Sequence, residues 1–324
     1  AAALAVTSVV QEEWQLTLTF GLLSGIGTGL IASVLGATVA NRWFVRHRGV
    51  VIGIFGAASS AGQLIFYPLL TSMVEGSGWR GSALTLAILA ALLSIPIALL
   101  LRDDPADLAV KPLGESATDR PVQRTSEEGT MRRALRTPTF WLLAGTFFVC
   151  GFSSNGVVGQ HFIAHAVDHG FTPGVAAEAL ALMGIFNFFG TIASGWLTDR
   201  IDPRKLLFVY YLFRGVSLLT LPVIHDSLGI VAFAVLFGID YIATVPPTIA
   251  LTADTFGRRN VGVVYGWVFA AHMVGAAVAA WGAGIIRDTQ GSYTIAFISA
   301  ALLAGLASLA ALMIRRPTVP TAAS

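Results

Sequence analysis

The sequence predicts an all-α bundle of membrane-spanning helices, and three observations lead to that fold class. Of the 324 residues, 55% are hydrophobic and only 12% are charged, whereas a soluble domain carries about 25% charged residues. The mean hydropathy is +0.74. Apolar stretches long enough for a bilayer core, which takes about 20 residues as a helix, recur along the chain between short polar segments. A polytopic membrane protein is therefore expected before any motif is considered.

Nine apolar stretches are expected to cross the membrane completely, and residues 1–10 look like the end of a further span. The nine are residues 15–40, 49–74, 81–101, 139–163, 176–198, 205–224, 228–252, 261–286 and 293–314. The longest polar stretch, 102–137, is rich in Asp, Glu, Arg, Pro and Ser, as is typical of a linker. We therefore expect an N-terminal bundle (1–101), a cytoplasmic linker (102–137) and a C-terminal bundle (138–324).

Positive charge lies almost entirely on one side of this topology. Seventeen of the 20 Lys and Arg residues fall there. They are Arg42, Arg46, Arg48, Arg102, Lys111, Arg120, Arg124, Arg132, Arg133, Arg136, Arg200, Arg204, Lys205, Arg258, Arg259, Arg315 and Arg316. The other side has only Arg80 and Arg287, and Arg214 lies inside a span. Because positive charge resists translocation, we expect the first side and the C-terminus to be cytoplasmic, in a cell membrane.

The chain also contains an internal repeat. Residues 49–62 read GVVIGIFGAASSAG and residues 262–275 read GVVYGWVFAAHMVG. The ungapped shift of 213 residues that joins them aligns further landmarks: Phe20 with Phe233, Gly25 with Gly238, Asn41 with Asp254, Arg46 with Arg259, Gly53 with Gly266 and Gly78 with Gly291. Two halves in the same orientation indicate a transporter built from parallel repeats. Residues 138–213 have no counterpart, so we expect about two and a half spans of about 20–25 residues to be missing before residue 1. The nine complete spans are therefore numbered four to twelve, of which 49–74 is span five and 139–163 is span seven.

The segment GWLTDRIDPRK at 195–205 resembles a loop signature of the major facilitator superfamily, G-x-L-a-D-r-x-G-r-k. The matching residues are Gly195, Leu197, Asp199, Arg200, Arg204 and Lys205. Asp202 replaces the second glycine of the signature. The resemblance implies the six-plus-six helix architecture of that family. Aspartate and arginine at neighbouring helix ends can pair with each other and with helix termini, which would latch one conformation.

Three further segments resemble the oxalate/formate antiporter and monocarboxylate transporter branch of that superfamily. They are NRWFVRHRG (41–49), DYIATVPPTIALTADTFGRR (240–259) and YGWVFAAHMVG (265–275). That branch commonly has an arginine on span eight for the substrate carboxylate, and Thr191 stands there in this chain. The oxalate-type lysine of span eleven aligns with His272. The resemblance implies a secondary active transporter for a small organic solute of the carboxylate-anion type. It would work by alternating access, with or without coupling to protons.

Places where only one half of the repeat is polar are candidates for function. His272 stands opposite Ser59 and near the middle of its span, where an imidazole can bind a proton or an anion. Arg214 and Asp240 stand opposite Ala1 and Gly27. Each lies 13 residues from Ser227, at the centre of the expected turn between their spans. Equal counts predict equal depth, so we expect a buried ion pair, either coupled to transport or only structural.

Other polar residues within the spans are candidates for lining a central cavity. They are Asn155 and Gln160 on span seven, Asn187 and Thr191 on span eight, Tyr241 on span ten, and Gln63 and Tyr67 on span five. The alternative for each is a hydrogen bond within its own helix. Pro246 and Pro247 are expected to bend span ten and to free backbone carbonyls.

Metal and cofactor sites are not expected. His161, His165 and His169 recur every four residues, a spacing that could hold a metal, but their place at an external helix end favours ordinary interfacial polarity. One cysteine, Cys150, provides neither a disulfide nor a cysteine-based metal site. The expected partners are a small-molecule substrate and the lipid bilayer, with no nucleic acid, and the protein is expected to be monomeric. A non-transporting sensor or an intramembrane enzyme on the same scaffold remains the alternative.

Overall fold

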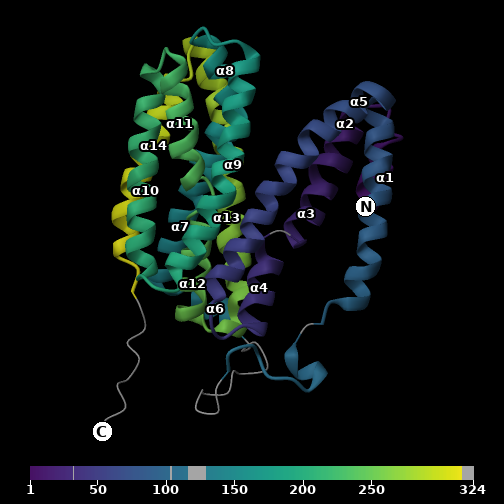
Figure 1. Ribbon diagram of the computed structural model, residues 1–324, viewed down its shortest axis with the longest axis vertical. Helices are drawn as coiled ribbons and strands as arrows, with labels where there is room; N and C mark the ends of the chain where they lie inside the picture. Colours follow the sequence, from purple (N-terminus) through teal and green to yellow (C-terminus); the bar gives the residue numbers. More distant parts are fainter. Residues whose placement is uncertain (32, 103, 116–128, 316–324) are drawn as a thin grey trace.

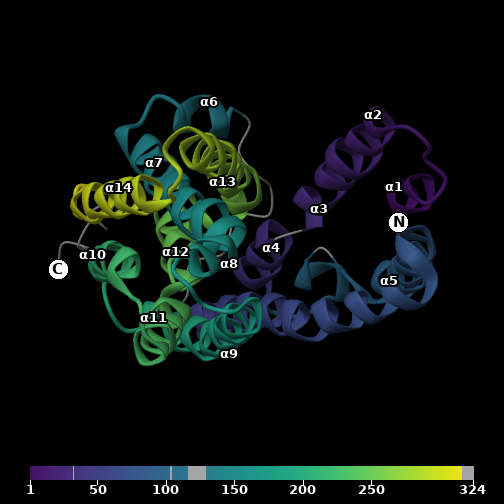
Figure 2. The ribbon, with the colours of Figure 1, turned by 90° about the horizontal axis from the view of Figure 1, so that it is seen from above.

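The computed structural model describes residues 1–31, 33–102, 104–115 and 129–315. The regular structure of these residues is helical, and an isolated bridge between Phe44 and Leu113 is the β-type pairing found among them. Figure 1 shows a tight helix bundle formed by the C-terminal part of the chain and a more open group formed by the first 100 residues. Seen from above, the open group meets the bundle along one edge only (Figure 2).

The N-terminal group runs from α1 to α5. Its elements are α1 (Ala2–Thr7), α2 (Glu13–Leu16), a π-helical segment (Thr17–Ser24), α3 (Gly25–Ile31), α4 (Ser33–Trp43) and α5 (Arg48–Leu100). Helix α5 is bent at Gly78, whose φ of 69° and ψ of 170° are not helical. A positive φ suits glycine, which has no Cβ to clash. Its repeat partner Gly291 also has a positive φ, 74°, so the repeat extends to the backbone at this pair.

The C-terminal bundle runs from α7 to α14. After a 3₁₀ turn (Pro105–Leu108) and α6 (Thr130–Ala134) come α7 (Pro138–Gly151), a π-helical segment (Phe152–Val158), α8 (Gly159–Asp168), α9 (Pro173–Thr198), α10 (Pro203–Thr220), a 3₁₀ turn (Leu221–Val223), α11 (Ser227–Asp240), α12 (Val245–Phe256), a 3₁₀ turn (Arg258–Asn260), α13 (Val261–Gln290) and α14 (Thr294–Leu312). Several begin at side chains that bond to a free N–H of the first turn. Thr137, Thr172, Asp202 and Asp226 do so for α7, α9, α10 and α11.

Eight helical stretches of the described chain are long and apolar enough to cross a membrane. They are Glu13–Trp43, Ser72–Leu100, Pro138–Asp168, Pro173–Thr198, Pro203–Val223, Ser227–Phe256, Arg258–Gln290 and Thr294–Leu312. The expected spans 49–74 and 81–101 both lie in α5, whose backbone is kinked between them at Gly78. The kink lies where the sequence pattern predicts the turn between two spans.

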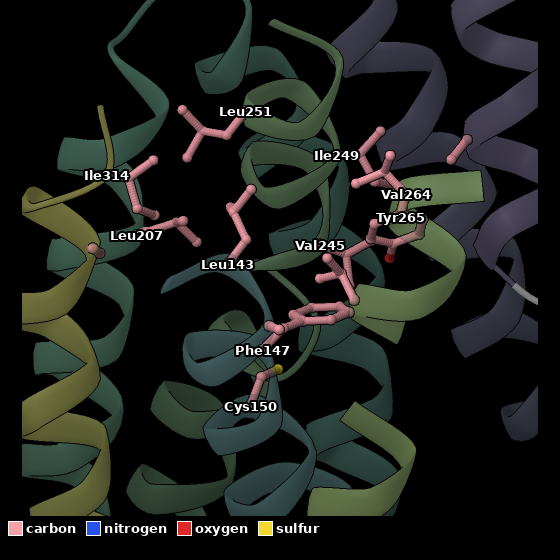
Figure 3. Close-up of a cluster of buried hydrophobic side chains, with 14 of the residues drawn as sticks. Leu143, Phe147, Cys150, Leu207, Val245, Ile249, Leu251, Val264, Tyr265 and Ile314 are labelled. Carbon is pink, nitrogen blue, oxygen red and sulfur yellow. The ribbon is translucent and has the colours of Figure 1, made fainter. Parts of the chain in front are cut away.

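The core of the C-terminal bundle consists of two apolar clusters. Figure 3 shows the first, in which Phe147 of α7 and Tyr265 of α13 lie next to each other above Cys150. The second contains Phe162 of α8, Phe233 of α11 and other buried side chains. Ser153, Arg214 and Asp240 come in the sequence between members of the first cluster and members of the second. The polar site is therefore surrounded by packed apolar side chains.

The two parts of the chain meet where α5 packs along α9 and α4 packs along α13. Glycine allows a very close approach between α5 and α9. A Cβ atom on Gly49 would lie 2.2 Å from the carbonyl oxygen of Gly195, and one on Gly53 would lie 2.8 Å from that of Thr191. Small residues are what close helix packing in lipid requires. This contact is the main junction between the repeat halves.

Candidate functional site

The site is organised around an interruption in the tenth expected span. Helix α11 ends at Asp240 and α12 begins at Val245, with Pro246 and Pro247 in its first turn. Proline has no N–H to donate, so backbone groups in the preceding turn lose their helical partners. The bend expected from the two prolines is present. Residues 241–244 therefore expose backbone polar groups inside the bundle, where water cannot satisfy them.

Arg214 of α10 binds directly to this interruption. Its Nε donates to Asp240 Oδ2 at 2.7 Å, and its Nη2 donates to the carbonyl oxygens of Asp240 (2.7 Å) and Tyr241 (3.1 Å). Its Nη1 donates to Cys150 Sγ at 3.1 Å and to Ser153 Oγ at 3.3 Å. A guanidinium has five N–H groups, so each of them finds an acceptor. The ion pair expected from equal depth is present, with the two side chains 0% and 1% exposed.

Two residues of α9 bind further backbone groups of the interruption. Asn187 Oδ1 accepts from the N–H of Ile242 at 3.2 Å, and Ser194 Oγ donates to the carbonyl oxygen of Ala243 at 2.5 Å. Asn187 also donates from Nδ2 to Ser60 Oγ of α5 at 2.6 Å. One side chain thus connects the interrupted helix of the C-terminal bundle to the N-terminal group.

The π-helical segment of α7 lies against the same place. Cys150 Sγ and Thr244 Oγ1 are 3.0 Å apart, and the Tyr241 hydroxyl donates to the carbonyl oxygen of Ser154 at 3.3 Å. Isolated π-helical turns inside α-helices occur frequently at functional sites. Side chains therefore join the end of α7 and the π-helical segment after it to the interrupted turn between α11 and α12.

His272 lies on α13 beside this network. Its ring lies 4.7 Å from that of Phe147 and stacks on Phe269 at 5.6 Å, measured between ring centroids. The residue is 5% exposed, and its Nδ1 has no hydrogen-bond partner within the described part of the chain. A buried ring nitrogen without a hydrogen-bond partner costs free energy.

The other candidates differ in how they are placed. Thr191 is fully buried and donates to the carbonyl oxygen of Asn187 at 2.7 Å, so its hydroxyl is used within α9. Asn155 is half-buried and accepts from Ser154 Oγ at 3.3 Å, whereas Gln160 is exposed. The side chains of Gln63 and Tyr67 lie outside the described residues.

Charged residues gather at the end of the molecule where the loop motif lies. Asp199 accepts from the N–H groups of Gly49 (2.8 Å) and Val50 (3.2 Å), the first turn of α5. A carboxylate at a helix N-terminus is stabilised by the free N–H groups and by the helix dipole. The motif aspartate of one half thus caps a helix of the other, across the close contact between Gly195 and Gly49.

The remaining motif residues bind within the C-terminal half. Arg204 Nη2 pairs with Asp202 Oδ2 at 2.7 Å, and Arg200 stacks over the Trp196 ring at 3.9 Å. The N–H of Lys205 donates to the carbonyl oxygen of Asp202 at 3.0 Å, and no hydrogen bond or ion pair of its side chain is found among the described residues. The modified turn of the motif therefore uses Asp202 to begin α10 and to hold Arg204 in place.

Further contacts join the two halves at this end. Arg258 donates to the carbonyl oxygens of Asn41 (2.8 Å) and Phe44, and Arg259 pairs with Asp104 at the start of the linker. The hydrogen bond from Arg259 holds the pKa of the Asp104 carboxyl below its ordinary value. The loop before α13 is thereby attached both to the end of α4 and to the linker.

At the opposite end, the rings of three histidines lie next to one another. The rings of His165 and His169 are 4.1 Å apart and those of His169 and His225 are 5.3 Å apart. No group of three or more metal-binding side chains is found in the described residues. Arg287 pairs with Asp168 nearby, with Nε 2.7 Å from Oδ2.

Sequence reasoning missed several members of the network. Cys150, Ser153 and Ser194 lie in apolar runs, where small polar side chains usually bond to their own helix. Ser60 was also missed, although it adjoins Ser59, the repeat partner of His272. Two sequence features did point to this network: the four-residue spacing of Asn187 and Thr191, and the two adjacent prolines of α12.

Comparison with known proteins identifies the family. The profile of the Major Facilitator Superfamily matches residues 1–239 and 162–324. Monocarboxylate transporter 12-B of Danio rerio is 29% identical over 306 residues, which cover 86% of this chain and 63% of that protein. The uncharacterized MFS-type transporter YcxA of Bacillus subtilis is 24% identical over 296 residues, covering 90% of this chain and 70% of that protein.

A solved structure has the same fold. The crystal structure of the transporter FucP in the outward conformation superposes with a TM-score of 0.67 at 18% identity, covering 98% of this chain and 80% of FucP. The chain spans 63% and 65% of the length of two monocarboxylate transporter 12 proteins, from Danio rerio and Xenopus laevis. The matched profile covers both halves, and the apolar helices are those of a multi-pass membrane protein. The chain belongs to the Major Facilitator Superfamily.

Proposed function

We propose that this chain forms part of a secondary active transporter that moves a small organic solute of the carboxylate type. Two bundles, residues 1–101 and 138–324, rock against each other about a site near the middle of the membrane, and the linker 102–137 joins them. The relatives support the solute class, since several are named as monocarboxylate transporters. Their names are those of transporters rather than enzymes. The interruption between α11 and α12 supports the site, because broken helices form the binding sites of many transporters.

The excess of positive charge in alternate loops supports the orientation. Loops 42–48, 199–205 and 258–259 lie on the cytoplasmic side in this proposal, together with the C-terminus. The contacts made by Asp199 and Arg258 then close the cytoplasmic side. The site would open to that side when α5 and α9 separate.

His272 is the group we propose for the solute or the coupling proton. All five donors of Arg214 are already bonded, so a solute carboxylate could reach this arginine only by displacing protein acceptors. His272 Nδ1 is buried without a partner among the described residues, and imidazole changes its charge near neutral pH. We assign the role to His272 rather than to Arg214 because of this difference in hydrogen bonding. Arg214 and Asp240 hold the interrupted helix in shape.

Counterflow in proteoliposomes tests the function. The protein that contains this chain is purified, reconstituted with an internal monocarboxylate, and tested for uptake of the labelled external compound between pH 5.5 and pH 8. We expect saturable uptake, and we expect His272→Gln to lower it and to flatten its pH dependence. The matched control is His225→Gln, which removes an imidazole at the external end.

The outcome separates this proposal from the alternatives. Saturable flux with a pH dependence unchanged by His272→Gln would remove His272 from the proposal and leave transport intact. Absence of flux for every organic acid, with and without a pH gradient, would overturn transport of carboxylates. Specific solute binding without flux would favour a sensor on the same scaffold.

A further inference from the structure

A cavity of about 500 Å³ lies between the two halves at the end that carries the basic loops. Its walls come from residues 41–52 around the start of α5, residues 198–203 around the loop motif, and α12. The share of liquid volume taken by one water molecule is about 30 Å³, so the cavity has room for a group much larger than a water molecule. It is separate from the buried network around Arg214, none of whose residues lines it.

Three arginines, Arg46, Arg48 and Arg200, line the cavity from both halves of the repeat. Two carboxylates also line it, but both are engaged. Asp199 accepts two N–H groups of α5, and Asp254 faces Arg48 at 3.8 Å. The positive end of α5 further offsets the charge of Asp199. The cavity therefore keeps an excess of positive charge.

Arg46 is the cavity arginine whose guanidinium N–H groups bind no other described residue. It makes no hydrogen bond or ion pair with any other residue that the structure describes. Its repeat partner, Arg259, is paired with Asp104. The two halves thus hold equivalent arginines, one neutralised within the protein and one directed to a cavity. Arg200 is held over the Trp196 ring and donates from Nη1 to the Trp196 carbonyl oxygen at 3.0 Å, and its other guanidinium N–H groups make no hydrogen bond within the described part of the chain.

We propose that this cavity binds a phosphate-type anion between Arg46, Arg48 and Arg200. A planar guanidinium presents paired N–H groups that match phosphate oxygens, and several of them around one anion give both affinity and orientation. The inference rests on the proposed orientation, which places the cavity at the cytoplasmic surface of the membrane. Phosphate groups there occur on lipid headgroups and on free metabolites, and both present the same chemistry to the cavity.

Binding would favour the closed arrangement of this end. Arg46 and Arg48 belong to the N-terminal half and Arg200 to the C-terminal half, so one anion would bridge the junction of α5 and α9. A ligand that contacts both halves binds better when they are together, and it shifts the population toward that state. The anion would therefore act on the same junction that Asp199 caps.

Thermal melting in lipid nanodiscs tests the site without any transport measurement. The chain is placed in discs of phosphatidylcholine alone and titrated with inorganic pyrophosphate, against sodium chloride at equal ionic strength. In a second arm, phosphatidylglycerol replaces part of the lipid and no pyrophosphate is added. The variants are Arg46→Gln, Arg200→Gln and, as a matched control, Arg136→Gln, an exposed arginine that does not line the cavity. Ligand that binds only the folded state raises the melting temperature.

We expect pyrophosphate to stabilise the wild-type chain and the Arg136→Gln variant, with a midpoint at least about ten-fold higher in Arg46→Gln and Arg200→Gln. Stabilisation by phosphatidylglycerol but not by pyrophosphate, lost in the same two variants, would assign the site to a lipid headgroup. No stabilisation by either, or equal responses from all three variants, would overturn the proposal. Because melting reports binding alone, these results stand whether or not the protein transports a carboxylate.

Discussion

Replacing Arg214 by leucine gives the most direct view of how the interrupted helix is held. The change removes five donors from a site where both partner side chains are at most 1% exposed. Breaking one side of a buried ion pair costs about 3–5 kcal/mol, because the remaining charge has no partner. The carbonyl oxygens of Asp240 and Tyr241 also lose their donor, at about 1–3 kcal/mol for an unsatisfied buried group. We therefore expect Arg214→Leu to lower the free energy of unfolding by at least about 4 kcal/mol.

The double variant Arg214→Leu/Asp240→Leu provides the sharper comparison. It has no orphaned charge, so we expect it to be more stable than Arg214→Leu alone, although the backbone carbonyls still lack a donor. The external pair of Arg287 and Asp168 is the control, because it has the same 2.7 Å Nε–Oδ2 distance but side chains that are 35% and 28% exposed. Arg287→Leu should cost no more than about 1 kcal/mol.

Equilibrium unfolding in mixed micelles, followed by circular dichroism, provides these free energies. A double variant whose loss equals the sum of the single losses would refute the reasoning, because the two side chains would then act independently. Equal losses for Arg214→Leu and Arg287→Leu would refute it as well.

Three further predictions concern the end that carries the basic loops. Gly49→Val, whose Cβ would lie 2.2 Å from a carbonyl oxygen of α9, should separate the halves there and raise the labelling of nearby introduced cysteines, whereas Gly62→Val, with no atom within 4 Å of its Cβ, should not. Asp199→Asn keeps an acceptor but loses the interaction of the charge with the α5 N-terminus, about 0.3–1 kcal/mol, so the same labelling should rise several-fold at most. The lowered pKa of Asp104 means that its bond to Arg259 stabilises the fold above the ordinary Asp value and loses this effect as pH falls through the lower folded value. Melting temperature should therefore fall less steeply with acid in Asp104→Asn, and an unchanged acid profile would contradict that link.

Much of the arrangement could be predicted from the sequence because it follows from burial. Arg214 and Asp240 lie the same number of residues from the turn at Ser227, which predicts that they lie at one depth in the membrane. A single charge in lipid needs a partner at that depth. The two prolines at 246–247 predict the interruption of span ten because proline has no N–H to donate to a helical hydrogen bond. Asp199 was expected to bind a helix end, and the structure identifies that end as the first turn of α5.

The parts that could not be predicted depend on tertiary contact. Nothing in the pattern shows that Asn187 reaches both Ile242 and Ser60, because those contacts join three helices that are distant in sequence. The π-helical turn at 152–158 has no sequence signature. Thr191 was expected to face a cavity, but it bonds to its own helix, so the hydroxyl is not available there. The kink at Gly78, by contrast, lies where the sequence pattern predicts the turn between two spans.

One measurement tests whether the two halves must part at α5 and α9 for solute to cross. The Ser60 Oγ and Asn187 Nδ2 atoms lie 2.6 Å apart across that junction, so Ser60→Cys together with Asn187→Cys places two thiols there for a short bis-methanethiosulfonate cross-linker. Counterflow is measured after cross-linking and again after reduction, with each single variant treated in the same way as a control. The account predicts that counterflow stops on cross-linking and returns on reduction. Complete cross-linking with unchanged counterflow would contradict it.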